Sequence, residues 1–429
     1  TLWTVPDTDR IISSINKEGV KRALIVGGGF IGLEMAENLA HAGLQVTLVE
    51  MLDQVMAPLD YELALLLHEH LEQQGVRLLL GDGVSSFDGS QGFVKVSLSS
   101  GKTLEADIVL LSIGTRPNNE LARAAGLELN QRGFVVTNNK MQSSDPSIYV
   151  VGDIAETDDY IDKSRTTVPL AGPANRQGRI AANNIAGLED TYEGSQGTST
   201  AKIFELTAAC TGLNEKTLVK RGLVRGRDFE AVIITQNSHA AYYPGAKPMT
   251  LKLLFSMDGK KIFGAQAVGR EGVDKRIDVL ATVIRLGGGV AELRRLELAY
   301  APPYSSAKDP VNMLGFVADN LLSGRVAFAD WDAIEKAEGD TVVLDVREAE
   351  ELLVFSVPGA VNIPLGQLRK RYTELDSTKK IIVLCAVGVR AYNAARILMQ
   401  KGFKDIRVYP GGASFYRSTH YKAMNAPNS

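Results

Sequence analysis

Short apolar runs alternate with amphipathic stretches along most of the chain, and glycine-rich turns separate them. Residues 23–26 form one such run, residues 31–42 have helical spacing, and residues 46–50 form a second run that ends in an acid. A short continuous apolar run is typical of a buried strand, and Gly43 suits the end of a helix. The pattern therefore predicts a strand, a helix and a parallel strand within residues 20–50.

The same pattern extends the first region to about residue 187. Turns rich in glycine, serine and aspartate separate further apolar runs. Strands are expected at residues 77–80, 94–98, 108–112 and 148–151. Residues 187–200 are rich in glycine, serine and threonine and have the composition of a connector.

Two more regions follow the connector. In the second region, we expect strands at residues 231–235, 250–255 and 261–268 and helices at residues 277–286 and 310–323. The third region begins near residue 326, and its expected strands, at residues 341–346 and 381–384, are each followed by a helix. The whole pattern predicts an α/β fold with several domains.

Composition narrows the classes of function. A length of 429 residues suggests about three domains. The 47 basic and 50 acidic residues nearly balance, with a net charge of −3, so nucleic acid is not an expected partner. No apolar run approaches the roughly 18 residues that cross a bilayer, and no signal-like segment opens the sequence. We therefore expect a cytoplasmic protein without a membrane span. Because the sequence starts with Thr1 rather than Met, we also expect it to be a fragment.

The cysteine content points to a reducing compartment. The sequence has two cysteines, Cys210 and Cys385, which excludes a framework of several disulfides. Cys210 lies among small residues without a cationic neighbour, so we expect it to be buried packing rather than a reactive thiol.

A glycine-rich turn lies directly between the first expected strand and helix. Gly27, Gly29 and Gly32 form the pattern GxGxxG, in which a tight turn lets backbone N–H groups meet a pyrophosphate. Glu50 lies at the end of the second strand, where its carboxylate can accept hydrogen bonds from an adenosine ribose. No lysine or arginine occurs in residues 51–60. The motif therefore predicts a dinucleotide site that favours NADH over NADPH.

With this motif in place, the chain resembles the flavin-dependent pyridine nucleotide-disulfide oxidoreductases over essentially its whole length. The resemblance is greatest to the coenzyme A-disulfide reductases that carry a C-terminal rhodanese domain, the coenzyme A persulfide reductases. It implies Rossmann-like FAD- and NADH-binding domains, an α+β dimerisation domain and an α/β rhodanese domain. The implied boundaries are 1–116 for the NADH-binding domain, 117–190 for the C-terminal half of the FAD domain, 191–324 for dimerisation and 325–429 for rhodanese.

The resemblance also assigns residues around the two cofactors. Phe30 and Ile31 belong to the NADH motif, and Gly114 begins the connection back to the FAD half. Glu34 would face the nicotinamide region, although an exposed acid near the start of a helix is an equally simple interpretation.

Two later segments indicate a flavin. Gly152 and Asp153 follow an apolar run, so the chain can approach a ligand closely while the carboxylate accepts from a ribityl hydroxyl. Pro169 opens an expected long helix, in which Ala174 and Gln177 match the family pattern. The positive end of that helix would stabilise negative charge on the flavin ring. A proline at a helix start is also ordinary structure.

One half of the family's FAD domain has no counterpart in the sequence. Relatives carry an N-terminal segment with its own glycine motif and a single redox cysteine, and neither occurs ahead of Thr1. The role of that cysteine does not transfer to Cys210. We therefore expect an N-terminally truncated sequence.

Two tyrosines are candidates for acid chemistry. The stretch from Tyr300 to Tyr304 lacks the histidine that glutathione-reductase relatives use. In coenzyme A-disulfide reductases, two tyrosines take its place, and by motif they match Tyr242 and Tyr300. A phenol can stabilise a leaving thiolate by donating a hydrogen bond. Aromatic residues beside proline and glycine can also simply pack a loop. Because the family site joins two subunits, a homodimer is implied.

Cys385 lies where the expected strand at residues 381–384 meets a helix. Backbone N–H groups of such a turn, the helix N-terminus and Arg390 would lower the pKa of the thiol and hold a persulfide anion. The spacing resembles a rhodanese loop, and Asp345 and Arg347 match a motif that supports the fold. Residues 386–389 are uncharged, so the loop does not reveal the sulfur donor.

The histidines give no sign of a metal site. His68 and His70 lie two residues apart on an expected helix and so face different directions. His41, His239 and His420 lack nearby ligands at metal spacing. We expect all five at the solvated surface and no bound metal.

Together, the motifs and the resemblance imply an FAD- and NADH-dependent enzyme that reduces coenzyme A persulfide and related small persulfides to thiol and sulfide, with Cys385 relaying sulfane sulfur and coenzyme A as a possible shuttle. A coenzyme A-disulfide or polysulfide reductase is the nearest alternative. A sulfurtransferase or sulfur-carrier module with a regulatory nucleotide domain is an alternative of another class.

Overall fold

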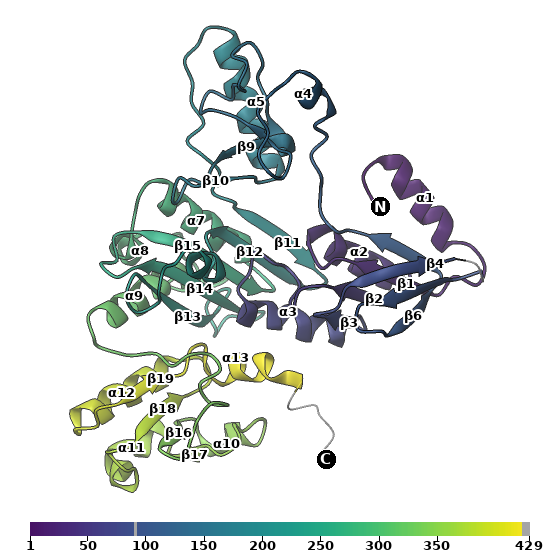
Figure 1. Ribbon diagram of the computed structural model, residues 1–429. Coiled ribbons are helices and arrows are strands. Elements are labelled where there is room, and N and C mark those ends of the chain that lie inside the picture. The colour runs from purple at the N-terminus through teal and green to yellow at the C-terminus, as the bar shows by residue number, and fades with distance from the viewer. Residues whose placement is uncertain (90–91, 423–429) are drawn as a thin grey trace. The chain divides into compact units, whose positions relative to one another are not determined.

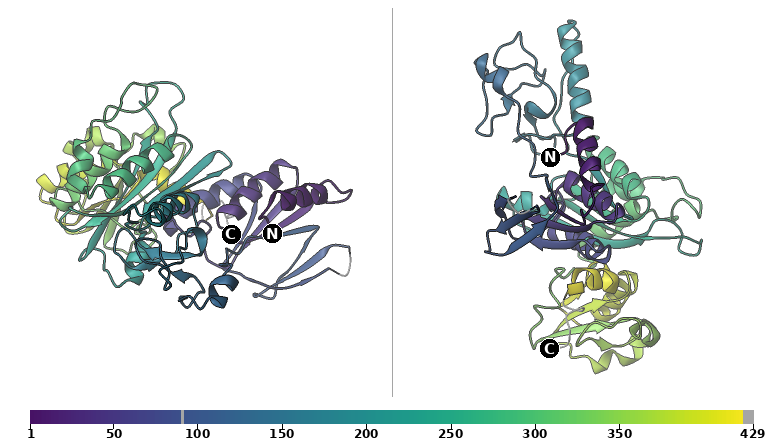
Figure 2. Two further views of the ribbon diagram at one scale, coloured as in Figure 1. Left: turned by 90° about the horizontal axis from the view of Figure 1, so that it is seen from above. Right: turned by 90° about the vertical axis from the view of Figure 1, so that its right-hand side faces the viewer.

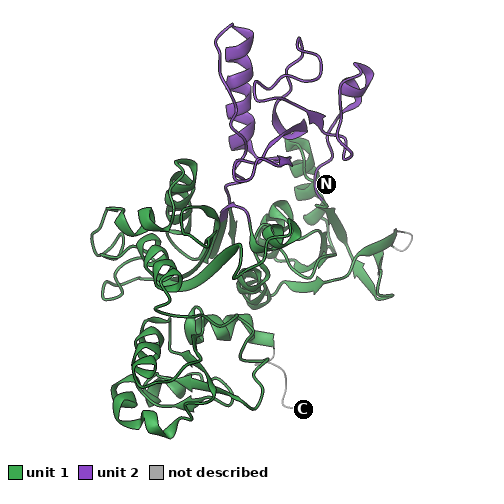
Figure 3. Ribbon diagram, turned by 60° about the vertical axis from the view of Figure 1, so that its left-hand side comes forward, with its two compact units in different colours: residues 1–113, 200–209, 214–429 green, residues 114–199, 210–213 purple. Residues whose placement is uncertain are grey.

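The computed structural model describes residues 1–89 and 92–422. Two compact units make up the chain (Figure 3). The first comprises residues 1–113, 200–209 and 214–429, and the second comprises residues 114–199 and 210–213. None of the helices within the described ranges has the length and apolar character that crossing a bilayer requires.

The first unit opens with a nucleotide-binding type of sheet (Figure 1). Its four strands pair in parallel in the order β3-β2-β1-β7, so the expected strand, helix and strand within residues 20–50 are confirmed. A three-stranded antiparallel sheet is inserted before β7. The elements are α1 (Val5–Ile15), β1 (Arg22–Val26), α2 (Phe30–His41), β2 (Gln45–Glu50), α3 (Tyr61–Gln73), β3 (Arg77–Leu80), β4 (Val84–Asp88), β5 (Val94–Leu98), β6 (Thr103–Ala106) and β7 (Ile108–Leu111).

A five-stranded sheet in the order β11-β12-β15-β14-β13 forms the next domain. Its long central strands are buried almost throughout, because helices cover the sheet and leave little of it to solvent. Asp309 starts the last helix, since its carboxylate accepts from Val311 N at 2.9 Å beside Pro310. The elements are β11 (Ser199–Ile203), β12 (Leu206–Gly212), α6 (Glu215–Lys220), β13 (Phe229–Asn237), β14 (Pro248–Ser256), β15 (Ile262–Gly269), α7 (Val273–Arg285), α8 (Val290–Arg295) and α9 (Pro310–Leu322).

The third domain has a parallel sheet in the order β17-β16-β18-β19. The central strand β18 is buried along four of its five residues, as expected for a strand with helices on both faces. The elements are β16 (Thr341–Asp345), α10 (Ala349–Leu352), β17 (Val361–Asn362), α11 (Leu365–Arg371), η2 (Tyr372–Glu374), β18 (Lys380–Leu384), α12 (Val389–Gln400), β19 (Ile406–Val408) and α13 (Gly412–Thr419). The predicted α/β fold class is thus confirmed.

Helix α13 of the third domain packs against α3 of the first (Figure 1). Lys422 pairs with Glu72 at 3.3 Å, and the rings of Tyr61 and Trp331 lie 6.0 Å apart. Side chains therefore hold the C-terminal domain against the nucleotide-type domain.

The second unit has less regular structure, and its longest element is the straight helix α5 (Figure 2). The expected strand at residues 148–151 is wrong, because this segment forms only an isolated bridge between Gln142 and Tyr149. An apolar run becomes a strand only where neighbouring backbone pairs along its length. The elements are α4 (Glu120–Ala124), β8 (Val135–Val136), η1 (Gly152–Ile154), β9 (Ala155–Asp158), β10 (Arg165–Thr166) and α5 (Ala171–Ile185).

Candidate functional site

The glycine-rich turn connects β1 to α2, and steric contacts explain its glycines. Gly27 has a φ of 107°, and a Cβ there would collide with the Ser112 carbonyl. A Cβ at Gly32 would collide with the Gly27 carbonyl, whereas Gly29 has open space around it and precedes the first residue of α2. The N–H groups of Phe30 and the exposed Ile31 lie in the first turn of this helix, where they have no partner within the helix. This arrangement suits a pyrophosphate.

Glu50 ends β2 and faces the same turn. Its Oε2 accepts from Gly28 N at 2.6 Å, and its Oε1 accepts from Leu52 N at 2.8 Å. Each carboxylate oxygen has a further lone pair that a ribose hydroxyl could use. The carboxylate therefore both fixes the turn and offers acceptors beside it, which suits NADH.

The two remaining nucleotide candidates are accessible. Glu34 is exposed on α2, four residues after its start. Gly114 is exposed with a φ of 95°, a backbone conformation that glycine adopts readily.

In the second unit, Gly152 and Asp153 lie in the short helix η1. Gly152 has a φ of 79°, and its N–H donates to the Gln177 side-chain oxygen at 2.8 Å. A Cβ at Gly152 would lie 3.8 Å from the Ala174 methyl. Gln177 is buried and holds this turn, whereas the side chain of Asp153 is exposed beside it. An accessible carboxylate next to a glycine is consistent with a ribityl contact.

Helix α5 begins at Ala171, two residues after Pro169. The proline in its first turn is instead Pro173, where no N–H partner is required. The helix start therefore differs slightly from the expected one. Its 15 residues still give the N-terminus the partial positive charge that was expected near a flavin.

Tyr242 and Tyr300 come together although they lie on different loops. Tyr242 follows β13 and Tyr300 follows α8, and their hydroxyl oxygens are 3.0 Å apart. Tyr242 is 77% exposed and Tyr300 is 47% exposed. The hydrogen bond to Tyr300 raises the pKa of Tyr242 above its usual value. Two phenol hydroxyls at the surface can donate to an anion that arrives from outside this domain.

Cys385 lies between β18 and α12, as predicted. It is 1% exposed, and its Sγ accepts from Gly388 N at 3.1 Å. Gly388 has a φ of 120°, which turns its N–H towards the sulfur. Gly412 supports the turn from behind, because a Cβ there would meet the carbonyl oxygens of Cys385 and Ala386 at 2.5 Å. The loop thus offers backbone donors to a thiolate or persulfide.

Arg390 is bound by an acid that the sequence analysis missed. Its guanidinium donates to both carboxylate oxygens of Glu351, at 2.6 and 2.7 Å. The hydrogen bond to Glu351 and, more weakly, the Cys385 sulfur raise the pKa of Arg390. The cation beside the sulfur is therefore shared with a carboxylate. Glu351 lies within an acidic helix start, where its residue type alone gives no hint of this role.

The supporting role of Asp345 and Arg347 is confirmed. Arg347 donates to both Asp345 carboxylate oxygens, the shortest contact being 2.6 Å. It also donates to the Phe355 carbonyl at 2.9 Å. The buried pair ties the end of β16 to the loop after α10.

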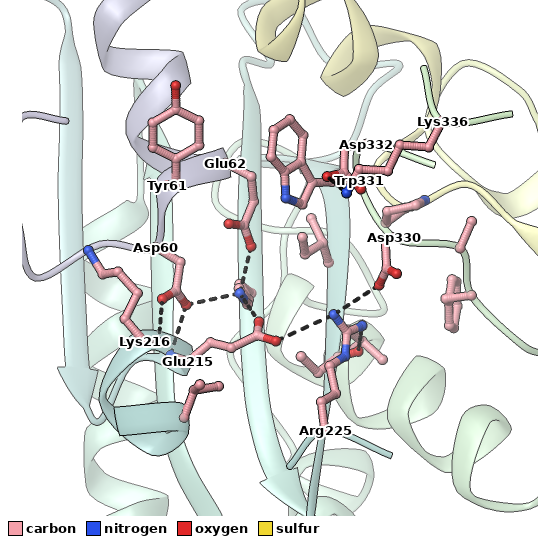
Figure 4. Close-up of a pocket in the computed structure, with 18 of the residues that line it drawn as sticks. Asp60, Tyr61, Glu62, Glu215, Lys216, Arg225, Asp330, Trp331, Asp332 and Lys336 are labelled. Atoms are coloured by element: carbon pink, nitrogen blue, oxygen red, sulfur yellow. Dashed lines mark hydrogen bonds and ion pairs between the residues drawn. The ribbon is translucent and has the colours of Figure 1, made fainter. Parts of the chain in front are cut away.

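A buried ion network lies where the three domains of the first unit meet (Figure 4). Lys252, 1% exposed, binds Asp60, Glu62 and Glu215 at 2.9, 2.6 and 2.5 Å. The three carboxylates are close enough together for a metal site, but the ammonium already lies among them. The network borders a cavity of about 630 Å³, across which Arg225 reaches Asp330 at 3.5 Å.

The surface prediction for the histidines is wrong for three of them. His68 is 1% exposed, its Nε2 accepts from Val55 N at 3.1 Å, and burial lowers its pKa to about 4. His70 and His239 are also buried. The His70 ring packs edge-on against Phe204 of a distant segment, with ring centroids 6.2 Å apart, a contact that local spacing does not show. Cys210 is buried, as predicted, with Sγ 3.3 Å from Ser199 Oγ.

Three family patterns match the chain. They are pyridine nucleotide-disulphide oxidoreductase at residues 2–178, the dimerisation domain of the same family at residues 198–310, and the rhodanese-like domain at residues 331–418. A coenzyme A disulfide reductase of Staphylococcus aureus (strain MRSA252) is 35% identical over 320 residues, which cover 74% of this chain and 70% of that protein.

Two solved structures are similar over nearly the whole chain. Reduced Bacillus anthracis CoADR-RHD superposes with a TM-score of 0.92 at 46% identity, covering 98% of this chain and 75% of that one. A NAD-dependent persulfide reductase from A. fulgidus gives a TM-score of 0.90 at 37% identity, covering 97% and 75%.

Proposed function

Because the chain belongs to the pyridine nucleotide-disulphide oxidoreductase family, we propose that it acts in an FAD- and NADH-dependent enzyme that reduces coenzyme A persulfide and related persulfides or polysulfides. The observation that carries this proposal is the presence, in one chain, of a dinucleotide turn at Gly27 and a sulfur-holding loop at Cys385. The names of two similar proteins, a coenzyme A disulfide reductase and a NAD-dependent persulfide reductase, support it.

The NADH site is proposed at the start of α2. Gly27, Gly29 and Gly32 let the backbone approach the pyrophosphate, and the free N–H groups of the first turn bind it. Glu50 accepts from the ribose hydroxyls and repels a 2′-phosphate. Glu34 lies on the same helix and would face the nicotinamide end.

The flavin contacts are proposed in the second unit, within residues 117–190. When bound, FAD supplies two-electron transfer between a nicotinamide and a sulfur centre. Asp153 would accept a hydrogen bond from a ribityl hydroxyl. Gln177 holds Gly152 in the conformation that leaves the Asp153 side chain exposed. Pro169 and Ala174, which flank the first residues of α5, would lie near the flavin. Gly114 would begin the link from the NADH-binding domain to the FAD half.

The tyrosine pair is proposed to protonate or stabilise the thiolate that leaves when a persulfide is cleaved. The net reaction, R–S–SH + NADH + H⁺ giving R–SH + H₂S + NAD⁺, balances in atoms and electrons. Tyr242 can donate because its hydroxyl is exposed and its partner Tyr300 accepts or donates in turn. Residues 191–324 match a dimerisation domain over most of their length, so we propose a homodimer in which each subunit presents its tyrosines to the other.

Residues 325–429 are proposed to relay sulfane sulfur. The Cys385 thiolate attacks the outer sulfur of a donor persulfide R–S–SH, the S–S bond breaks, RS⁻ leaves, and Cys385 carries the persulfide. Coenzyme A thiolate then removes the outer sulfur in the same way. Neither step changes the net oxidation state. Because neither cysteine forms a disulfide, we propose a cytoplasmic setting.

The test is NADH oxidation by the full protein, loaded with FAD, with coenzyme A persulfide as the acceptor. We expect turnover with the persulfide that exceeds turnover with coenzyme A disulfide. Faster reduction of the disulfide would favour the nearest alternative, and absence of any NADH turnover would refute the reductase.

The variant Cys385→Ser distinguishes the proposed sulfur transfer through Cys385 from NADH-dependent reduction of the persulfide. We expect this variant to keep NADH turnover with coenzyme A persulfide and to lose turnover driven by small persulfides with catalytic coenzyme A. Cys210→Ser is the matched control and should leave both activities unchanged. Equal losses in both variants would argue against the relay.

A further inference from the structure

The sulfur loop, residues 385–390, contains one cation, and a carboxylate of the same chain neutralises it in the absence of substrate. Within residues 385–390, Arg390 is the single charged residue, and Glu351 binds it through both carboxylate oxygens at 2.6 and 2.7 Å. Such a bidentate pair occupies the Nη1 and Nη2 edge of the guanidinium, one of the edges that can bind a carboxylate or an oxyanion. Both side chains are about one-third exposed, so solvent ions can reach the pair.

Glu351 is held in this position by its own backbone environment. Its Oε2 also accepts from Glu348 N at 3.0 Å, closing the N-terminus of α10. The hydrogen bond from Arg390 lowers the pKa of Glu351 to about 2. The carboxylate is therefore ionised and fixed throughout the neutral range, and Arg390 cannot turn freely towards an anion.

One side of the loop, at residues 387–389, borders a mainly apolar cavity. A cavity of about 290 Å³ borders Val387, Gly388 and Val389. Apolar side chains of α9, including Phe316 and Val317, line its other side, and Lys308 is the one charged residue among the described lining residues. An apolar cavity favours an uncharged organic group over a hydrated inorganic anion.

We propose that Glu351 is a specificity-determining residue of the sulfur loop, which disfavours anionic sulfane donors such as thiosulfate and favours organic persulfides that are uncharged beside the sulfur. The inference rests on the proposed sulfur relay. Both donor classes react by the same exchange: the Cys385 thiolate bonds to the outer sulfur, the S–S bond breaks, and sulfite or a thiolate leaves with the electron pair. The donors differ in the group bonded to the outer sulfur, which is an anionic sulfonate in thiosulfate and an uncharged organic thio group in the persulfide. Glu351 therefore acts through Arg390 on the choice of donor.

The experiment compares Glu351→Gln with Glu350→Gln in the full FAD-loaded protein. Glutamine preserves the shape and the helix-capping oxygen but removes the charge, and Glu350, exposed on the same helix, loses the same charge away from Arg390. Thiosulfate and 2-hydroxyethyl persulfide are the donors, cyanide is the acceptor, and thiocyanate formation is measured without NADH.

We expect Glu351→Gln to raise the ratio of kcat/KM for thiosulfate to that for the persulfide by about tenfold, because the unpaired charge of Arg390 attracts the anionic sulfonate and not the uncharged organic group. Glu350→Gln should change the ratio less than about twofold. The ratio cancels any loss of folded protein. An unchanged or lower ratio in Glu351→Gln would overturn the proposal.

A second measurement applies even if cyanide-dependent turnover is absent. Alkylation of Cys385 by iodoacetate and by iodoacetamide, quantified by peptide mass spectrometry, compares an anionic with a neutral reagent of similar size. Glu351→Gln should raise the iodoacetate to iodoacetamide rate ratio by about tenfold, and an equal ratio in both variants would refute the charge effect. Because neither assay uses NADH, failure of the reductase remains distinguishable from failure of this inference.

Discussion

The hydroxyl oxygens of Tyr242 and Tyr300 lie 3.0 Å apart, although 58 residues separate the two side chains along the chain. The loops after β13 and α8 bring them together, and both hydroxyls remain accessible. Their hydrogen bond raises the pKa of Tyr242, so this phenol remains protonated to a higher pH than an ordinary tyrosine. Tyr242 is thus a neutral donor across the physiological range.

Removing the Tyr242 hydroxyl should slow cleavage of the persulfide without affecting NADH binding. We expect Tyr242→Phe to lower kcat for coenzyme A persulfide by about 10²-fold, the effect typical of losing one donor to a developing anion. Tyr304→Phe, at another exposed tyrosine nearby in sequence, is the control. Stopped-flow measurement of flavin reduction by NADH should give the same rate in both variants. A wild-type kcat in Tyr242→Phe would remove the tyrosine pair from the mechanism.

Glu50→Ala should weaken NADH binding and reduce discrimination against NADPH. The variant loses the ribose acceptor and leaves the N–H groups of Gly28 and Leu52 without the carboxylate. The expected rise in KM for NADH is about tenfold, with a smaller change for NADPH. Glu18→Ala, at an exposed residue outside the glycine turn, should leave both KM values unchanged. Equal effects on the two nucleotides would indicate a purely structural role for Glu50.

Lys252→Met should destabilise the first unit strongly. The variant would leave Asp60, Glu62 and Glu215 without the buried ammonium that binds all three, and breaking a buried ion pair from one side costs about 3–5 kcal/mol. Chemical denaturation would measure the loss, with the exposed Lys260→Met as a control of near-zero effect. A change below about 1 kcal/mol would show that the carboxylates find other partners.

The same network predicts sensitivity to acid. Burial opposes ionisation of Asp60, but the charge and hydrogen bond of Lys252 outweigh it, so the pKa of Asp60 is lowered. A lowered folded-state pKa stabilises the fold above the ordinary aspartate pKa, and this contribution is lost as the pH falls through the folded value. The free energy of unfolding should therefore decrease when the pH is lowered past about 4. In Lys252→Met, the free energy of unfolding should decrease less steeply over the same acidic pH range than in the wild type.

In the third domain, His420 should make the stability depend on pH with the opposite sign. Burial opposes its charged form, but hydrogen bonds to Glu335 and Tyr416 outweigh it and raise the pKa above 6.5. The stabilisation is complete below the unfolded pKa and is lost as the pH rises through the folded value. Thermal unfolding should occur at a lower temperature at about pH 9 than at about pH 6. This difference should vanish in His420→Gln and persist in His41→Gln.

The sequence by itself determined those elements that depend on interactions between residues close together in the chain. The dinucleotide turn and the Cys385 turn could be predicted from turn glycines, the acid at the end of β2 and apolar runs of strand length. Steric limits and hydrogen bonding act there within a few residues. The run at residues 148–151 failed as a strand for the complementary reason, since pairing depends on a neighbour that the run itself does not contain.

Tertiary structure alone decided which charges meet. Glu351 and Arg390 are 39 residues apart, Lys252 and Glu62 are 190 apart, and no spacing rule links either pair. The burial of His68 depended likewise on α3 packing against the loop that carries Val55. Residue types and turn geometry thus identified the sulfur and nucleotide chemistry from the sequence. The charge state and partners of those groups followed only from folding, because electrostatic energy depends on distance in space and on exclusion of water, not on separation along the chain.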